Sequence, residues 1–354
     1  MQTKQKSSNK IDMLQGPLLG KLCLFALPLA ASSILQQLFN AADIAVVGRF
    51  ASSRALAAVG ANSSAINLMV NLFVGLSVGA NVVIASLIGK GEQKKINAAV
   101  HTVIALALIS GVFLLLLGQV VAGGILTLMH TPAGVIEQAV LYLRLYFLGM
   151  PFIMLYNFGS AILRSKGDSK RPLYSLTAAG LVNVLLNLLL VIVFKLGVAG
   201  VAIATVISNV ASSSLILLFL LREEDDFRLD FRRLCLKREH LSRVVKIGAP
   251  AGLQGMVFSF SNVCIQTALN GFGAEAIAGS AAALNYECFG YFIVNAFTQA
   301  CVTFTSQNYG AHQTDRCRRV FRLSFDSGIL LNMLLCGCFL LLRRPLIAVY
   351  TPDL

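Results

Sequence analysis

Nine long apolar runs, separated by short polar connections, limit what this chain can fold into. The runs are approximately residues 22–47, 55–88, 97–122, 138–162, 173–194, 198–221, 244–272, 276–306 and 323–342. Each reaches or exceeds the roughly 20 residues that a helix needs to cross a bilayer. With 56% hydrophobic and only 13% charged residues, a soluble domain could not bury this much apolar surface. The sequence therefore predicts an all-α, polytopic membrane helix bundle with nine transmembrane helices, because a helix satisfies its own backbone polar groups within lipid.

Lys and Arg residues are distributed unevenly between the two sides of the predicted membrane. The N-terminal arm and the connections at 89–96, 163–172, 222–246 and 310–322 hold 23 of the 29, and the alternate connections hold the other 6. Cytoplasmic loops are enriched in these residues, so the pattern predicts a multi-pass protein of the plasma or inner membrane with a cytoplasmic N-terminus. This placement accounts for the net charge of +13, so membrane lipid is an expected partner and nucleic acid is not.

Four sequence anchors recur at nearly constant spacing, which predicts an internal repeat. The pairs, each 220 to 222 residues apart, are ALP (26–28) with GAP (248–250), ALAAVGA (55–61) with AIAGSAA (276–282), Gly89 with Gly310, and Pro132 with Pro352. The first unit has six runs, an even number, so both units would enter the membrane from the same side. They would be parallel repeats related by an axis along the membrane normal.

The second unit has only three apolar runs before residue 354. We therefore expect a parent of twelve helices in two parallel six-helix repeats, of which this sequence holds nine and is truncated at the C-terminus. The predicted domains are a cytoplasmic N-terminal arm (1–20), an N-lobe of six helices (21–222), a cytoplasmic inter-lobe linker (223–243) and an incomplete C-lobe of three helices (244–354).

A single carboxylate, Asp43, lies near the end of the first apolar run. Gln36, Asn40 and Asp43 are spaced i, i+4 and i+7, so they share one face of a helix. A carboxylate facing lipid is costly, so Asp43 should point inward, toward water or a partner. Desolvation there favours the neutral acid, and the group can hold a proton or a cation but not both, which is the minimum chemistry of an antiporter. The alternative is that Asp43 caps a helix or hydrogen-bonds between helices near the outer interface.

Further polar residues at membrane depth could form a pocket and a cavity. Asn183 and Asn187 share a face of the fifth run, and Thr205 lies in the sixth, so all three could surround Asp43. Glu287 is the second candidate for a functional acid. The predicted lining of the substrate cavity is Gln36, Asn40, Asn67, Asn71, Glu287 and Tyr291. The alternative is that the asparagines and Glu287 serve as hydrogen bonds between helices or lobes.

The connection ILRSKGDSKRPL at 162–173 combines a predicted tight turn with basic residues. Gly167 and Asp168 form the turn, and Arg164, Lys166, Lys170 and Arg171 flank it. We expect the basic residues to anchor the loop at anionic headgroups. The alternative is that they serve topology and turn geometry only.

Four motifs in this chain resemble those of the multidrug and toxic compound extrusion (MATE) transporters, in particular the prokaryotic members. They are QQLFNAADIAVVGRF (36–50), ILRSKGDSKRPL (162–173), LGVAGVAIATVIS (196–208) and SQNYGAH (306–312). The resemblance covers essentially the whole chain. It implies two six-helix lobes around a central cavity, and the export of organic, often cationic, compounds in exchange for protons or sodium. It also implies that Asp43 is the family's acid in the first helix, and that Asn183, Asn187 and Thr205 help to form an N-lobe cation site.

One departure from the family pattern bears on the coupling ion. Some relatives carry a second acid where this chain has Asn187, and its loss weakens the case for tight sodium binding. The oxygen atoms of Asp43, the two asparagines and Thr205 could still suit a hard cation. We expect a proton rather than sodium as the coupling ion, and no cofactor or metal beyond a possible sodium ion at Asp43.

The sequence therefore predicts a cation-coupled multidrug efflux antiporter that works by alternating access on small drug-like molecules, with no obligate protein partner. Two alternatives remain open: a lipid-linked-precursor flippase, whose cavity should hold several cationic residues, and a membrane scaffold or sensor without turnover. The interiors of the apolar runs hold almost no Lys or Arg. An enzyme is not expected, because the chain has no phosphate-loop spacing, paired acids or nucleophile–base set.

Overall fold

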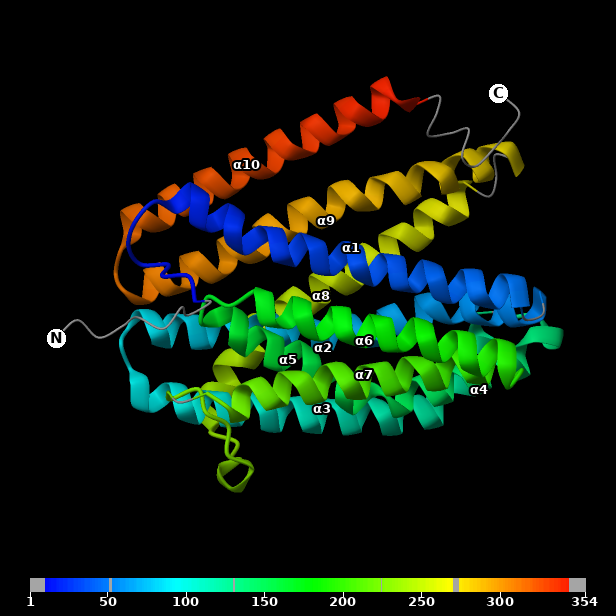
Figure 1. The fold of residues 1–354 in the computed structure, drawn as a ribbon, viewed down its shortest axis with the longest axis horizontal. Coiled ribbons are helices and arrows are strands. Elements are labelled where there is room, and N and C mark those ends of the chain that lie inside the picture. The colour runs from blue at the N-terminus through cyan, green and yellow to red at the C-terminus, as the bar shows by residue number, and fades with distance from the viewer. Residues whose placement is uncertain (1–9, 51–52, 130, 224, 270–273, 344–354) are drawn as a thin grey trace.

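The fold is a bundle of long helices (Figure 1). The computed structural model describes residues 10–50, 53–129, 131–223, 225–269 and 274–343, and no strand occurs in these ranges. The elements are α1 (Leu18–Phe50), α2 (Ser53–Gly89), α3 (Gln93–Leu128), α4 (Ala133–Leu148), α5 (Met150–Ser165), α6 (Lys170–Asn187), the π-helix η1 (Leu188–Val193), α7 (Gly197–Leu221), the 3-10 helix η2 (Phe231–Arg233), α8 (Arg238–Leu269), α9 (Ala274–Gly310) and α10 (Thr314–Leu341). The predicted all-α class is confirmed for these residues. The first nine residues of the N-terminal arm, and Pro352 of the repeat anchors, lie outside them.

Seven of the described helices are long and apolar enough to cross a membrane, or eight if the bent pair α4–α5 is one span. A multi-pass membrane protein is therefore confirmed, but the count of nine spans is not. The run at 138–162 is broken at Gly149 into two helices bent by 47°, because Pro151 in the first turn of α5 cannot continue the hydrogen-bond ladder of α4. The run at 244–272 forms α8, whose polar residues, such as Gln254 and Asn262, lower its mean hydropathy.

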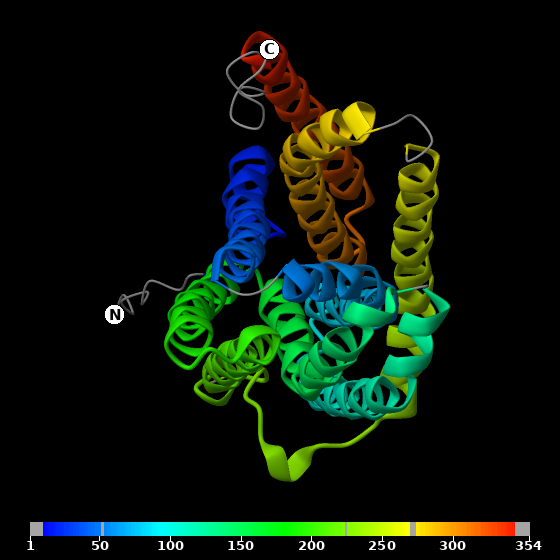
Figure 2. The ribbon, with the colours of Figure 1, turned by 90° about the vertical axis from the view of Figure 1, so that its right-hand side faces the viewer.

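Two groups of helices can be distinguished when the bundle is viewed along its length (Figure 2). Helices α2 to α5 and α7 pack around the largest apolar core, α6 packs on α7, and α9 and α10 lie together on the other side of the molecule. Helix α8 starts against α2 and diverges from it toward the start of α9 (Figure 1).

Helix α1 belongs to the cores of both groups. Its first half packs on α9 and α10, where Phe25 meets Phe304 edge-on with ring centroids 5.7 Å apart. Near its other end, the fully buried Val47 joins the larger core of α2 to α7. Pro28 lies inside α1, in the half that packs on α9.

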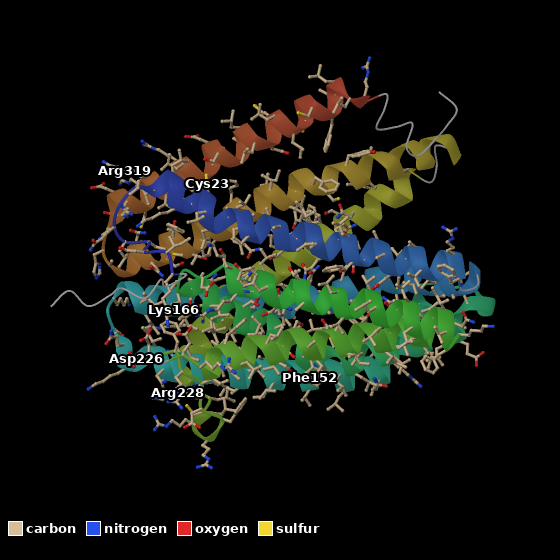
Figure 3. All side chains as sticks on the ribbon, viewed as in Figure 1. Cys23, Phe152, Lys166, Asp226, Arg228 and Arg319 are labelled. Atoms are coloured by element: carbon tan, nitrogen blue, oxygen red, sulfur yellow. The ribbon has the colours of Figure 1, made fainter. Side chains whose placement is uncertain are left out.

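The Lys- and Arg-rich segments come together at one end of the bundle, which we call the basic end (residues 10–16, 89–96, 163–172, 222–246 and 310–322). Lys166, Asp226, Arg228 and Arg319 all lie toward this end (Figure 3). Hydrogen bonds connect the segments: the side chain of Asn97 donates to the carbonyl of Asp226 at 3.0 Å, and the amide of Ile11 donates to the carbonyl of Gly167 at 3.1 Å. The alternation predicted from the sequence therefore places these segments on the same side.

The α2–α8 contact brings two backbones together at glycine residues. A Cβ atom on Gly75 would lie 2.2 Å from the amide nitrogen of Gly252, and one on Gly79 would lie 2.4 Å from the carbonyl oxygen of Val244. Small residues allow membrane helices to approach closely and to gain van der Waals contact along their backbones. Glycine is therefore required sterically at both positions.

We expect Gly75→Ala to destabilise the protein by about 1–3 kcal/mol, the usual cost of overpacking a tight contact. The matched control is Gly60→Ala in the same helix, where an added Cβ meets nothing within 4 Å. Thermal unfolding in detergent, followed by intrinsic fluorescence, should show a lower melting temperature for Gly75→Ala alone. Equal melting temperatures for the two variants would contradict the tight α2–α8 contact.

A cluster of charged residues connects the turn after α5 to the segment after α7. The Lys166 ammonium lies 2.7 Å from a Glu223 carboxylate oxygen and 3.0 Å from one of Asp225. Arg171 pairs with both Asp168 and Glu223. The predicted tight turn is confirmed, with Gly167 at φ +93°. Lys166 and Arg171 are paired with carboxylates of the protein itself, and the anchoring of this loop at lipid headgroups stays a prediction.

The pKa of Glu223 is lowered from its ordinary value. Burial by itself would raise this pKa, but hydrogen bonds and charge interactions with Lys166 and Arg171 outweigh the burial. A carboxyl group with a lowered folded-state pKa stabilises the protein above its ordinary pKa, and that stability is lost as the pH falls through the folded-state value.

We therefore expect Glu223→Gln to lower the melting temperature at pH 7, since Lys166 and Arg171 lose a charged partner. The difference from the wild type should shrink as the pH falls below about 4, where the unfolded carboxyl is already protonated. Calorimetric scans between pH 7 and pH 3 measure this difference. Asp315→Asn is the control, because the Asp315 side chain is 91% exposed and should change little. A constant difference across the pH range would refute the role of the Glu223 charge.

Candidate ion-coupling site

The site is built around Asp43, near the end of α1. The side-chain amide of Asn187, the last residue of α6, donates one hydrogen bond to the Asp43 carboxylate and a second, of 3.1 Å, to the side-chain oxygen of Asn183. Asn183 and Asn187 are one turn apart on α6, so both side chains project from the same face toward α1. The structure thus brings together three of the four residues that the sequence predicts for ion coupling.

The side-chain oxygen of Asn187 is an unused acceptor. It is buried, and no hydrogen-bond partner for it occurs among the described residues. A buried acceptor without a donor costs roughly 1–3 kcal/mol, so it is retained only where something compensates. The unpaired oxygen belongs to the side chain whose amide contacts the Asp43 carboxylate. An acceptor oxygen beside a carboxylate is a suitable environment for a bound proton donor or cation.

Asn187 also marks a change of helix geometry. The π-helix η1 begins at the next residue, Leu188, and runs to Val193. It closes wider turns, as in the bond from the amide of Phe194 to the carbonyl of Leu189. Such π-turns occur frequently at functional sites because they alter the direction of neighbouring side chains. The sequence, which is uniformly apolar here, gives no signal for it.

Thr205, the fourth predicted residue, lies on α7, which packs against α6 and η1. Its hydroxyl donates to the carbonyl of Val201 at 2.9 Å, so the oxygen keeps its lone pairs for another ligand. No hydrogen bond joins Thr205 to Asp43 in the described part of the chain. Its place in the ion site stays a prediction.

Two tyrosines near Asp43 were not predicted from the sequence. Tyr142 and Tyr146 stack one turn apart on α4, with ring centroids 6.1 Å apart, and both lie close enough to interact electrostatically with the Asp43 carboxylate. Aromatic residues in an apolar run look like ordinary packing residues. Two signals could have identified them: their i, i+4 spacing, and their position in the helix that ends at the Gly149 bend.

The six predicted cavity residues do not form one hydrogen-bonded cluster in the structure. Five of them have exposed side chains: Gln36 and Asn40 of α1, Asn67 of α2, and Glu287 and Tyr291 of α9. Asn71 is half-buried and donates to the Ser259 hydroxyl of α8 at 2.9 Å. Tyr291 stacks on Phe258 of α8, with ring centroids 5.6 Å apart. A common cavity lined by all six stays a prediction.

A large, mostly apolar pocket lies elsewhere. It has a volume of about 770 Å³ between α2, α8, α9 and α10, and mostly apolar side chains line it, among them Phe297 and Phe321. None of the residues predicted for ion coupling or for the cavity lines this pocket.

Comparison with known proteins gives a consistent result. The MatE family model matches residues 28–189 and 250–354. The chain is 30% identical over 328 residues to "Probable multidrug resistance protein YoeA" of Bacillus subtilis, covering 91% of this chain and 70% of that protein. It is 28% identical to "Probable multidrug resistance protein YpnP" of Bacillus subtilis, of which it spans 60%. It is 25% identical to "Probable multidrug resistance protein NorM" of Thermotoga maritima, of which it spans 72%.

Solved structures share the fold. One titled "Outward-facing conformation of a multidrug resistance MATE family transporter of the MOP superfamily" superposes with a TM-score of 0.89 at 22% identity, covering 99% of this chain and 78% of that one. One titled "Crystal structure of MATE in the bent conformation" gives a TM-score of 0.88 at 22% identity, covering 96% and 76%. The family match and the relatives are those of transporters, not enzymes, which confirms the resemblance seen in the sequence. The chain therefore belongs to the MatE family of multidrug efflux transporters.

Proposed function

We propose that this protein exports small organic, often cationic, molecules in exchange for a cation, and that Asp43 is the group that exchanges it. The observation that carries the proposal is the hydrogen-bonded set of the half-buried Asp43 and the buried Asn183 and Asn187, with one acceptor oxygen of Asn187 left without a partner among the described residues. The names of the relatives, which describe them as multidrug resistance proteins, support drug-like substrates.

The exchange follows from the charge of Asp43. When the carboxylate is ionised, it attracts a cation or a proton. Asn187 holds the carboxylate in place through a hydrogen bond. When the charge is neutralised, the attraction for a cationic molecule in the same lobe is lost. Binding of the coupling ion and of cargo then exclude each other. Each elementary charge that crosses the membrane contributes about 2.3 kcal/mol per 100 mV.

The coupling ion is proposed to be a proton, with sodium as the alternative. Oxygen atoms from Asp43, Asn183, Asn187 and Thr205 form a donor set that fits a sodium ion. A single carboxylate, however, supplies only one negative charge to balance it. If sodium does bind, these residues would hold it, and it would supply the positive charge that displaces cargo.

The basic end is proposed to face the cytoplasm, with the N-terminus. The support is that the segments gathered at this end hold most of the Lys and Arg residues, as cytoplasmic loops do. The two helix groups are joined here and diverge toward the opposite end (Figure 1). Alternating access would then open one end as the other closes.

The segments that hold α1 to α7 and α8 to α10 are proposed to be parallel repeats related by a two-fold axis. Two reciprocal contacts, each between one residue and the repeat equivalent of the other at an offset of 221 positions, support this. A Cβ atom on Gly89 would lie 1.9 Å from the carbonyl oxygen of Gln307, and one on Gly310 would lie 2.3 Å from the carbonyl oxygen of Ser86. Gly89 and Gly310 are one equivalent pair, and Ser86 and Gln307 are the other. Reciprocal contacts of this kind are expected where equivalent helices cross on a symmetry axis.

The direct test of the exchange is Asp43→Asn. The new side chain keeps an oxygen that can accept from Asn187, so folding should be preserved while the charge is lost. We expect gradient-driven export of a fluorescent cationic dye from inverted vesicles or liposomes to fall to background. The control is Asp326→Asn, which removes an exposed acid of α10 and should leave export unchanged. Export by Asp43→Asn at the wild-type rate would refute the assigned role, and would favour a scaffold or another coupling group.

A second variant tests the choice of ion. Asn187→Asp adds a second carboxylate beside Asp43, and we expect it to increase sodium affinity at least tenfold because a hard cation gains a charged ligand. Isothermal titration calorimetry with sodium chloride, against choline chloride, measures this at a pH where both acids ionise. Asn71→Asp is the matched control, since Asn71 contacts Ser259 of α8 rather than Asp43. No difference between the two variants would contradict a cation site at Asn187.

A further inference from the structure

The segment that precedes α1 contacts both helix groups at the basic end. We call residues 10–16 the strap. On the side of α2 to α7, its Ile11 amide donates to the carbonyl of Gly167 at 3.1 Å. Its Lys10 ammonium lies 2.9 Å from Asp225, and so extends the charged cluster of Lys166 and Glu223. The strap is therefore fixed to the turn between α5 and α6 and to the segment after α7.

The other side of the strap is fixed to α9 and α10. The side-chain amide of Asn308, a fully buried residue of α9, donates to the carbonyl of Met13 at 3.1 Å. Arg316 of α10 donates to the carbonyls of Gln15 and Gly16 at 3.0 and 3.1 Å. The Met13 side chain is 1% exposed and belongs to the apolar core that α1 shares with α9 and α10. One short non-helical segment thus bridges the two helix groups.

Beneath the strap, a row of polar side chains on α9 joins the same two groups. The row, with residues spaced i, i+4 and i+8, is Gln299, Thr303 and Gln307. Gln299 accepts from the Arg164 guanidinium at 2.7 Å, and Gln307 donates to the carbonyl of Ser165 at 2.6 Å. Between them Thr303 accepts a hydrogen bond of 3.0 Å from Asn81 of α2. All three bonds reach from α9 to the other helix group.

These bonds must break if the basic end opens, and the two layers differ in how they can do so. The α9 row lies inside packed helices, so its bonds break only when whole helices move apart. The strap is a single non-helical segment held by its backbone carbonyls, one backbone amide, the Lys10 ion pair and the buried Met13 side chain. It can leave by itself, and once it has left, Asn308 and Arg316 no longer connect the groups through it. The strap is therefore the part that must be released before the helices separate.

We propose that the strap is the latch of a cytoplasmic gate: docked, it holds the two helix groups closed at the basic end, and undocked, it lets them separate. This rests on the proposed alternating access, but not on the identity of the coupling ion or of the cargo. The gate consists of the strap and the α9 row of Gln299, Thr303 and Gln307.

Gly167→Ala is the variant that tests the latch. Gly167 has φ +93°, and a Cβ there would lie 2.4 Å from the carbonyl oxygen of Ile11, so the strap cannot stay in place. Gly91→Ala is the matched control: it has φ +70° in another turn of the same end, and an added Cβ meets nothing within 4 Å. Arg316→Gln removes the hydrogen bonds from α10 to the carbonyls of Gln15 and Gly16. Its control is Arg319→Gln, at an exposed position of α10 for which no hydrogen bond to the strap occurs among the described residues.

The separation of the groups is measured directly, without transport. Spin labels are placed at Lys94→Cys in α3 and Arg318→Cys in α10, both exposed positions, in a variant of the full chain whose eight native cysteines are replaced. Pulsed electron paramagnetic resonance in nanodiscs gives the distribution of distances between the labels. Limited trypsin cleavage after Lys10, quantified by mass spectrometry, reports whether the strap has left its site.

We expect Gly167→Ala and Arg316→Gln each to raise the long-distance population at least twofold and to accelerate cleavage after Lys10, while both controls stay at the wild-type values. Distance distributions equal to the wild type in both test variants would overturn the proposal, and faster cleavage with unchanged distances would show that the strap only covers the gate. Because dye export by Asp43→Asn is measured separately, failure of the latch and failure of the antiport mechanism give different results.

Discussion

The backbone contacts of α2 with α8 and α9 are the constraint on which the rest of the structure depends. At Gly75, Gly79 and Gly89 no side chain separates the helices, so amide and carbonyl groups of one group touch those of the other. In lipid there is no solvent-driven force to press helices together, and such close packing supplies the attraction instead. The position of every other element at the basic end, including the strap and the α9 row, follows from this contact.

A different constraint applies to the Asp43 site. It is the free-energy cost of placing a charge or an unpaired polar group away from water. The carboxylate is held by Asn187, which in turn is held by Asn183, so each side chain restricts the next. Within this set of three side chains, the buried Asn187 oxygen has no partner among the described residues. Unpaired groups of this kind are typical of functional sites rather than of structural cores.

Much of this arrangement could be predicted from the sequence, because it depends on local periodicity. The apolar runs predict the helices, and the i, i+4 spacing of Asn183 and Asn187 predicts their common face. One break in these runs, at Gly149, coincides with Pro151 in the first turn of α5. What could not be predicted depends on contacts between distant segments. The pairing of Lys166 was not predicted, because its partner, Glu223, lies 57 residues further along the chain.

The membership of α1 in two cores has a mechanical consequence. Its first half is packed with Phe304 in the core of α9 and α10, and Val47, one turn beyond Asp43, is packed in the core of α2 to α7. A straight helix packed at both ends cannot follow two helix groups that rotate apart. Helix α1 would then either bend or lose its contacts with one of the groups. Pro28 removes a backbone hydrogen bond from α1 in its first half. Helix α1 is thus a continuous stretch of backbone that connects the surroundings of Asp43 to the core of α9 and α10 at the basic end.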